Sequence, residues 1–161
     1  MASSSKVVFP DFEHSLPMLL LKAREAVMTR FRPMLREVGL TEQQWRVIRA
    51  LSEVEDQDAG ELATVSYILS PSLTRILQRL EARGLIKRQA DVADQRRRLI
   101  SLTGDGRKLF ERVRPLSRDI YAEIASELGT DRLSGLYNIL EEVEQTLLTG
   151  PPDIECDVTR A

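Results

Sequence analysis

The sequence predicts a mainly α-helical protein with one small β-hairpin, in a chain of 161 residues. Apolar side chains recur at spacings of three and four over most of the chain, which is the pattern of amphipathic helices. Glycine, proline and aromatic residues are scarce, whereas the helix-favouring Leu, Glu, Arg and Ala are plentiful. The length is that of one domain with a core of its own.

Three long helices are predicted, one near the start of the chain and two at its end. Residues 14–38 carry a single apolar stripe, and Gly39 is placed to end that helix in a left-handed conformation. Residues 104–128 and 131–148 carry two further stripes. These stripes are more than a small domain can cover alone, so they indicate a partner surface. The alternative is that the helices cover one another within a monomer.

Two shorter helices are predicted between them. Thr41 and Gln44 have the spacing of a capping box, so a helix begins there and ends by about Glu55. A short helix with apolar Leu, Ala and Val positions follows from Glu61 to about Ser66.

A further helix is predicted after a tight turn over residues 67–70. Ser70 is its expected N-cap, Pro71 lies in its first turn, and Gly84 closes it. A short helix, a tight turn and a second helix with a polar outer face form a helix-turn-helix. The apolar positions at i, i+3, i+4 and i+7, which should face inward, are Leu73, Ile76, Leu77 and Leu80.

Two strand candidates, residues 85–89 and 98–102, follow the second helix and flank a polar tip over 90–97. A two-stranded hairpin attached to a helix-turn-helix is a wing, so the fold class is a winged helix-turn-helix. The N-terminal and C-terminal helices would form a dimerisation region around it.

Positive charge is concentrated in this middle segment. Residues 70–103 hold eight Lys and Arg against three Asp and Glu, whereas the rest of the chain holds fifteen against twenty-two. This distribution predicts contact with a polyanion, and duplex DNA is the polyanion that a winged helix-turn-helix binds. The alternative for the helix is a solvated polar face, which the neighbouring basic wing disfavours. The predicted contacts are Ser70, Ser72, Thr74, Arg75, Gln78 and Arg79 on the helix and Asp94, Arg96, Arg97 and Arg98 on the wing.

Several classes of function are disfavoured. One histidine and one cysteine cannot supply a four-ligand metal site of the usual kind, and no intramolecular disulfide is possible. We find no phosphate-binding glycine loop and no nucleophile beside a base, so we expect neither an enzyme nor a cofactor. No apolar run approaches the roughly 20 residues that span a bilayer, and a cytoplasmic location is expected. Cys156 lies in a tail, residues 149–161, that is expected to be irregular and to play no redox role.

The wing carries a motif, Asp94-x-Arg96 followed by Leu102-Thr103-x-x-Gly106, that resembles the MarR family of bacterial transcription factors. The resemblance covers about residues 12–148. Four further segments resemble the subgroup that regulates homoprotocatechuate (4-hydroxyphenylacetate) degradation: Ala23-Arg-Glu-Ala26, Phe31-Arg-Pro33, Leu40-Thr-Glu-Gln-Gln-Trp-Arg46 and Pro71-Ser-Leu-Thr74.

The resemblance implies a homodimer in which residues 12–38 and 104–148 form the dimerisation helices and residues 41–103 form the DNA-binding region. Two-fold symmetry then predicts a palindromic operator with half-sites about 10 bp apart. Family members usually repress transcription and leave the operator when a small phenolic or aromatic acid binds.

The resemblance also implies a role for the wing tip. Arg96 would enter the minor groove, whose narrow, negative floor attracts a guanidinium. Asp94 would hydrogen-bond Arg96 and aim it, or form the turn, or do both. At most one of Arg97 and Arg98 should face DNA alongside Arg96, because side chains alternate along a strand.

For an effector we expect a small aromatic carboxylate, which an arginine could bind and an indole could cover. Each candidate has a structural alternative: Trp45 as a core residue, and either arginine in a surface ion pair with Glu25 or Glu42. Two other functions stay open, namely a regulator of the same fold that answers another small carboxylate or a xenobiotic, and a small-molecule-binding or enzymatic protein with an incidental wing. The candidate ligand residues are His14, Ser15, Arg24, Trp45 and Arg46.

Overall fold

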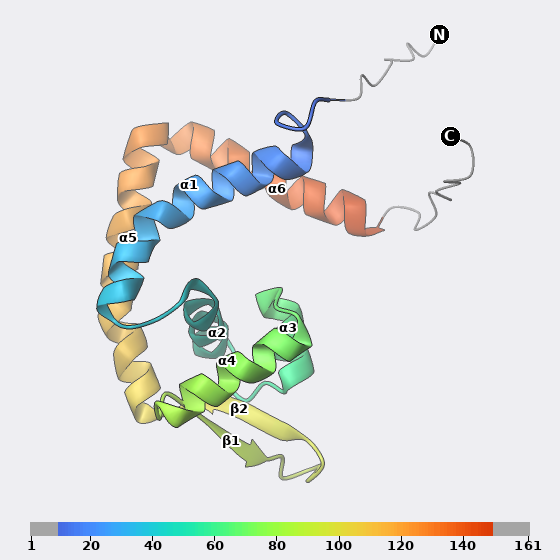
Figure 1. Cartoon of the computed structure of the whole chain (residues 1–161), viewed down its shortest axis with the longest axis vertical. Coiled ribbons are helices and arrows are strands. Elements are labelled where there is room, and N and C mark those ends of the chain that lie inside the picture. The colour runs from blue at the N-terminus through green and yellow to red at the C-terminus, as the bar shows by residue number, and fades with distance from the viewer. Residues whose placement is uncertain (1–9, 150–161) are drawn as a thin grey trace, which may run out of the picture. The chain divides into compact units, whose positions relative to one another are not determined.

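The computed structural model describes residues 10–149, which form six helices and one two-stranded antiparallel sheet (Figure 1). They divide into two compact units after Ile120, inside the longest helix. No helix in this part of the chain is long and apolar enough to cross a membrane. In chain order the elements are α1 (Leu16–Glu37), α2 (Glu42–Glu53), α3 (Ala59–Ser66), α4 (Ser70–Ala82), β1 (Ile86–Ala90), β2 (Arg98–Leu102), α5 (Gly104–Leu128) and α6 (Thr130–Thr149). The predicted mainly α fold with a hairpin wing is confirmed.

The core of the first unit lies among α2, α3, α4 and the hairpin. The strands pair in the register that sets Ile86 opposite Leu102 and Ala90 opposite Arg98. Gln57 adds a bridge to Ile100 on β2, so the segment before α3 is attached to the sheet. The inward face of α4 is as its spacing predicts, since Leu73, Ile76, Leu77 and Leu80 are all buried.

The junction between the hairpin and α5 explains the Leu-Thr-x-x-Gly pattern. The Thr103 hydroxyl donates to the Gly84 carbonyl at 2.5 Å and accepts from the Gly106 N–H at 3.1 Å. A Cβ on Gly106 would lie 2.0 Å from the Leu85 carbonyl oxygen, so only glycine fits where the first turn of α5 crosses the start of the hairpin.

The helix after Thr41 ends at Glu53, in agreement with a predicted end by about Glu55, and its capping box is confirmed. Two other predicted helix starts were wrong. The next helix begins at Ala59 and not at Glu61, because Asp58 is its N-cap. Ser70 is the first residue of α4 and not its N-cap; Leu69 holds that position without a side-chain cap.

Smaller differences occur elsewhere. The helix predicted over 14–38 is α1, and Gly39 is left-handed at φ 65° as predicted. The first strand is shifted by one residue from 85–89, the strand at 98–102 is confirmed, and α6 extends the predicted 131–148 by one residue at each end. Thr149 therefore belongs to α6, and the rest of the predicted tail, with Cys156, lies outside the described residues.

Two helices leave their apolar stripes exposed. In the first unit, α1 buries only Phe31, Met34 and Leu35, near its C-terminal end. In the second unit, α6 buries none of its residues. The exposed apolar residues include Leu16, Leu19, Leu20, Leu21 and Val27 of α1 and Leu136, Tyr137, Ile139, Leu140, Leu147 and Leu148 of α6.

Candidate nucleic-acid interface

The outer face of α4 is polar and open to solvent. Tyr67, in a left-handed conformation with φ 50°, ends α3 and turns the chain toward α4. The Thr74 hydroxyl donates to the Ser70 carbonyl at 3.0 Å, which satisfies its proton within the helix. All the residues predicted to contact DNA from this helix are exposed: Ser70, Ser72, Thr74, Arg75, Gln78 and Arg79.

The turn at the wing tip is built around Asp94. Its Oδ1 accepts from the backbone N–H of Arg96 at 2.9 Å, and its carbonyl accepts from the N–H of Arg97 at 2.9 Å. Asp94 thus forms the turn, one of the two roles predicted for it, and acts on the Arg96 backbone. The Arg96 and Arg98 side chains are exposed on either side of Arg97.

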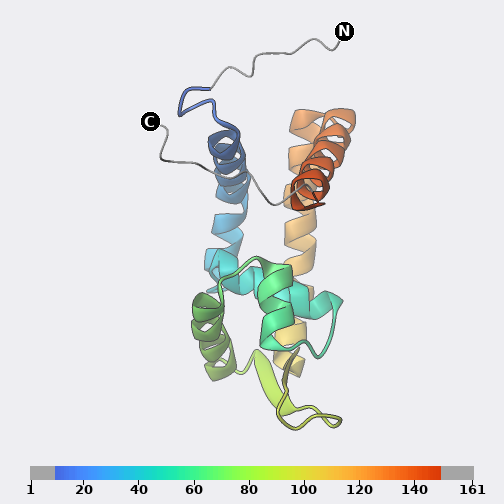
Figure 2. The ribbon, with the colours of Figure 1, turned by 90° about the vertical axis from the view of Figure 1, so that its right-hand side faces the viewer.

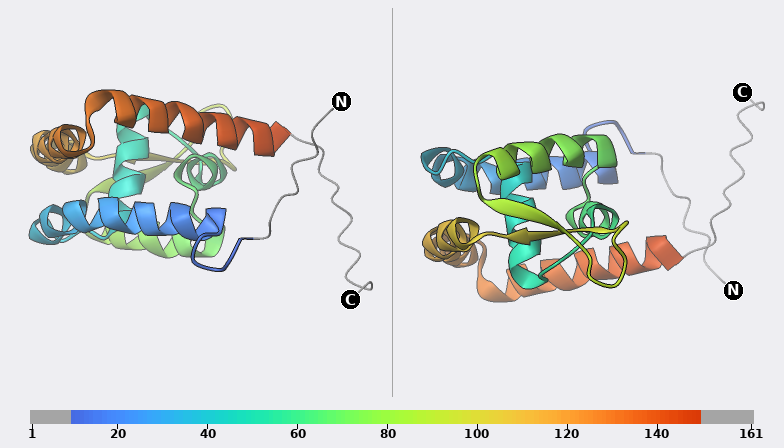
Figure 3. Two further views of the ribbon diagram at one scale, coloured as in Figure 1. Left: turned by 90° about the horizontal axis from the view of Figure 1, so that it is seen from above. Right: turned by 90° about the horizontal axis from the view of Figure 1, so that it is seen from below.

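The wing and α4 share one side of the first unit. Figure 2 shows the hairpin extending beyond α3 and α4, and the right-hand view of Figure 3 has α4 and both strands toward the viewer. Within residues 10–149, Arg75, Arg79, Arg96 and Arg98 have no ion-pair partner. Exposed guanidinium groups without an ion-pair partner on α4 and on the wing are suited to phosphate and base-edge contacts.

Arg97 differs from its neighbours because carboxylates surround it. Its Nη2 lies 2.6 Å from Asp58 Oδ2 and 3.1 Å from Glu61 Oε1, and its Nη1 lies 3.9 Å from Asp91 Oδ2. Hydrogen bonds from the Glu61 backbone and from Arg97 hold the pKa of Asp58 below its ordinary value. Asp58 in turn raises the pKa of Arg97. The Arg97 guanidinium is therefore already engaged at the N-terminus of α3.

Arg24, a predicted ligand residue, lies in an ion-pair network between α1 and α2, which is the structural alternative stated for it. Its guanidinium reaches Glu25 at 2.6 Å and Glu42 at 2.7 Å. Arg32 binds the same two carboxylates, with Glu42 at 2.6 Å. Burial would raise the pKa of Glu42, but hydrogen bonds from Arg32 and Arg24 outweigh it and lower that pKa.

The other ligand candidates also have local partners. Trp45 is 6% exposed and stacks on Phe110, which is the core position given as its alternative. Arg46 donates to the Ser66 carbonyl at 3.0 Å. His14 Nδ1 lies 2.8 Å from Asp11, and the Ser15 hydroxyl donates to the Phe12 carbonyl at 2.9 Å. Within residues 10–149, no hydrogen bond or ion pair joins any two of the five candidates.

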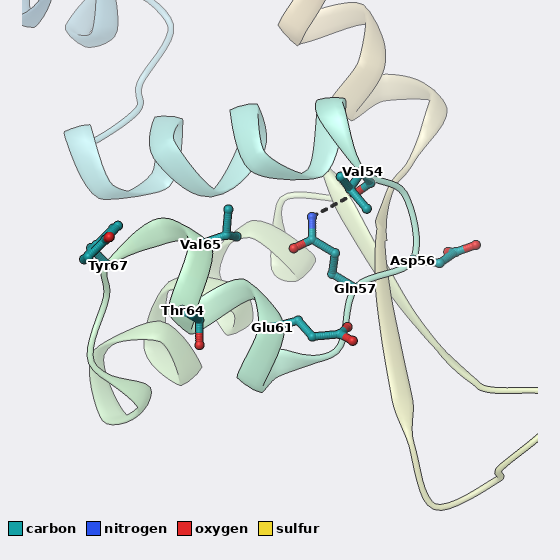
Figure 4. Close-up of a pocket in the computed structure, with 7 residues that line it drawn as sticks. All are labelled: Val54, Asp56, Gln57, Glu61, Thr64, Val65 and Tyr67. Carbon is teal, nitrogen blue, oxygen red and sulfur yellow. Dashed lines mark hydrogen bonds between the residues drawn. The ribbon is translucent and has the colours of Figure 1, made fainter. Parts of the chain in front are cut away.

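An open cavity of about 850 Å³ lies beside α3 (Figure 4). Gln57, one of the lining residues, donates from Nε2 to the Val54 carbonyl at 2.9 Å. The predicted ligand residues do not line this cavity. Its lining residues are Val54, Asp56, Gln57, Glu61, Thr64, Val65 and Tyr67.

The sequence pattern of the MarR family matches residues 40–97, which contain the helix-turn-helix and most of the wing. The homoprotocatechuate degradative operon repressor of Escherichia coli is 42% identical over 128 residues, which are 80% of this chain and 86% of that protein. The chain belongs to the MarR family. The predicted resemblance, including the likeness to homoprotocatechuate regulators, is confirmed.

Solved structures of other MarR-fold regulators agree with this assignment. NadR in complex with 4-hydroxyphenylacetate superposes with a TM-score of 0.75 at 40% identity, covering 81% of this chain and 96% of that one. The repressor CouR bound to a 23-mer DNA duplex superposes with a TM-score of 0.75 at 27% identity, covering 85% and 99%. The similar proteins are regulators of transcription and not enzymes.

Two acids at the N-terminus of α3 were not among the predicted site residues. Asp58 and Glu61 form a capping box at the N-terminus of α3, with both reciprocal hydrogen bonds at 2.9 Å. Their three-residue spacing is a signal that could have revealed the cap. Their contact with Arg97 joins positions 39 and 36 residues apart, which no local pattern indicates.

Proposed function

We propose that this MarR-family protein is a ligand-responsive transcriptional repressor that binds a palindromic operator as a homodimer. The observation that carries the proposal is the exposed polar face of α4 beside a wing with available arginines, on one side of the same unit (Figure 3). A role on DNA also places the protein in the cytoplasm.

In this proposal α4 enters the major groove. Arg75 and Arg79 have the donors to bind guanine O6 and N7, and Gln78 has the paired donor and acceptor that adenine presents. Ser70, Ser72 and Thr74 supply short hydroxyls for phosphates or base edges. Arg96 reaches the minor groove from the turn that Asp94 forms, and Arg98 binds the backbone.

The exposed apolar stripes support a homodimer. α1 and α6 each leave large apolar side chains in solvent, among them Leu16 at 52% and Leu147 at 71% exposure. Such surface is costly to leave in water and marks an interface. A two-fold dimer would present two copies of α4 to successive turns of the duplex.

The proposed effector is a small aromatic carboxylate that releases the operator. NadR, 40% identical over most of this chain, was crystallised with 4-hydroxyphenylacetate, and the Escherichia coli relative represses a homoprotocatechuate operon. The candidate residues remain His14, Ser15, Arg24, Trp45 and Arg46. An effector that binds the DNA-free arrangement of the dimer more tightly would shift the population away from the operator-bound one.

Fluorescence anisotropy tests the proposal, with labelled duplex from upstream of the gene and an unrelated duplex of equal length as control. We expect binding to the upstream duplex that is at least about a thousandfold tighter and weakens steeply with salt. A panel of aromatic carboxylates, including 4-hydroxyphenylacetate, should release it. Release by other compounds alone would favour a regulator with a different signal, and absence of binding at low salt would refute the DNA role.

A further inference from the structure

An ionic cluster of Arg97, Asp58 and Glu61 joins the wing to α3, in addition to the ion pair at 3.1 Å between Arg88 of β1 and Glu81 of α4. Arg97 precedes β2, whereas the two acids lie at the N-terminus of α3. The Arg97 Nη2 atom binds both, at 2.6 Å to Asp58 and 3.1 Å to Glu61. We call these three residues the wing latch.

Each of the two acids uses one carboxylate oxygen to cap α3 and the other to bind Arg97. Asp58 Oδ1 accepts from the Glu61 N–H and Glu61 Oε2 accepts from the Asp58 N–H, both at 2.9 Å, which caps α3. The second oxygen of each, Oδ2 and Oε1, binds Arg97. The two residues that cap α3 therefore also bind Arg97. Their negative charge is favourable at the N-terminus of a helix.

Backbone contacts fix the wing next to the latch. Gln57 and Ile100 exchange two hydrogen bonds, N to O at 3.2 Å and 2.8 Å. The Gln57 side chain donates to the Ala50 carbonyl at 3.1 Å and the Val54 carbonyl at 2.9 Å, which anchors it to α2. The tip beyond Arg97 has no comparable anchor among the described residues, and residues 92–98 are all exposed. Among the described residues, the wing latch is therefore the contact with α3 that lies nearest to the turn at Asp94.

We propose that Arg97 is a positioning residue, which with Asp58 and Glu61 holds the wing tip in the orientation from which Arg96 contacts DNA. The proposal rests on the proposed function, because it assigns a part of the same interface. A two-stranded hairpin is marginally stable by itself, so an ionic tie to α3 narrows the positions that its tip occupies before DNA arrives.

For removal of the Asp58 charge, a positioning role and electrostatic repulsion predict opposite changes in DNA affinity. Asp58 is an acid close to a surface that binds a polyanion, so removing its charge should strengthen DNA binding if the latch has no role. If the latch positions the tip, the same change weakens binding. A direct phosphate contact by Arg97 would also be strengthened when Asp58 no longer competes for the guanidinium.

The first test compares Asp58→Asn with Asp56→Asn in operator binding. Asparagine is as good an N-cap as aspartate, so α3 keeps its cap while the ion pair between Asp58 and Arg97 is lost. Asp56→Asn removes the same charge two residues away, at a left-handed φ of 58° that asparagine tolerates, and keeps an oxygen for Gln89. We expect a roughly two- to fivefold weaker affinity for Asp58→Asn, as for loss of a partly exposed ion pair, and no loss for Asp56→Asn.

Arg97→Gln separates positioning from direct contact. A positioning Arg97 leaves the salt dependence of binding at the wild-type slope, and adding Asp58→Asn to Arg97→Gln costs nothing further. If Arg97 binds a phosphate, Arg97→Gln should lower the slope of log affinity against log salt concentration by about 0.9. The effects of Arg97→Gln and Asp58→Asn on affinity would then differ and would not come from loss of the same contact. Tighter binding by Asp58→Asn, or a lowered slope for Arg97→Gln, would overturn the proposal.

Amide hydrogen exchange tests the latch without DNA. The amides of Ala93, Arg96 and Arg97 donate within the tip, to Asp91 and Asp94. We expect them to exchange faster in Asp58→Asn than in the wild type or in Asp56→Asn, with unchanged helix content by circular dichroism. Equal exchange in all three proteins would overturn the latch, whereas failure of the wild type to bind DNA would refute only the proposed function.

Discussion

Trp45 on α2 stacks against Phe110 on α5, with ring centroids 5.8 Å apart and an angle of 26° between the planes. Both residues lie in the first unit, and Trp45 is 6% exposed. The indole thus joins the helix that follows the capping box of Thr41 to the helix that follows the wing. A residue in this position contributes to stability whether or not it also forms the wall of an effector site.

Trp45→Ala should lower the free energy of unfolding by about 3–5 kcal/mol, because it removes a large buried aromatic and leaves a cavity. Trp45→Phe keeps an aromatic ring against Phe110 and should cost less. Chemical denaturation at one fixed protein concentration measures both, since unfolding of an oligomer depends on concentration. Unchanged stability for Trp45→Ala, together with loss of the response to aromatic acids, would identify Trp45 as a ligand residue only.

Glu42→Gln should make the protein less sensitive to acid. The pKa of Glu42 is lower in the folded state than its ordinary value of 4.5, because Arg32 and Arg24 donate to its carboxylate. The ion pairs therefore stabilise the fold above pH 4.5, and this contribution is lost as the pH falls through the lower folded-state pKa.

Chemical denaturation at pH 7 and pH 3.5 measures this difference. The wild type should lose more unfolding free energy between the two pH values than Glu42→Gln, which has no carboxylate to protonate at that position. Glu37→Gln, an exposed acid on α1 for which no partner lies among the described residues, is the matched control. An equal loss in all three proteins would show that the network contributes nothing to acid stability.

The helix-turn-helix was predictable because local rules agree with one another there. The spacing of Leu73, Ile76, Leu77 and Leu80 fixed the inner face of α4, and all four are buried. Because these four residues face the core, the polar residues of α4 between them had to face outward. The N-cap was wrong because Ser-Pro is a common helix start, whereas here the chain enters α4 through the exposed Leu69 and the turn at Tyr67.

The wing latch and the ligand candidates show where local rules end. Arg97 belongs to a run of three arginines, and nothing in the sequence around it indicates its partner Asp58, which is 39 residues away. For Arg24 the sequence left open a ligand or an ion pair with Glu25 or Glu42, and only the folding of α1 against α2 brings the Glu42 carboxylate within 2.7 Å. Charge partners across elements depend on tertiary structure, which periodicity does not encode.

Arg96→Ala should abolish most operator affinity without unfolding the protein, since the side chain is exposed and makes no ion pair with the described residues. Its amide bond to Asp94 is a backbone contact that alanine retains. Lys108→Ala removes the same charge from an exposed residue of α5, which pairs with Asp105 at 3.4 Å. Anisotropy should show a large loss for Arg96→Ala and a small one for Lys108→Ala; equal losses would remove the wing from the interface.

Arg75→Ala should cost about 1–3 kcal/mol of operator binding and relax the preference at one base pair, as expected for a guanidinium that binds guanine O6 and N7. The residue lies on the outer face of α4 one turn from the N-terminus of the helix, where a recognition helix contacts bases. Binding to a set of operators with single substitutions gives the preference at each position. If the loss is the same for every sequence and the salt slope falls by about 0.9, Arg75 binds a phosphate and base recognition must come from Gln78 or Arg79.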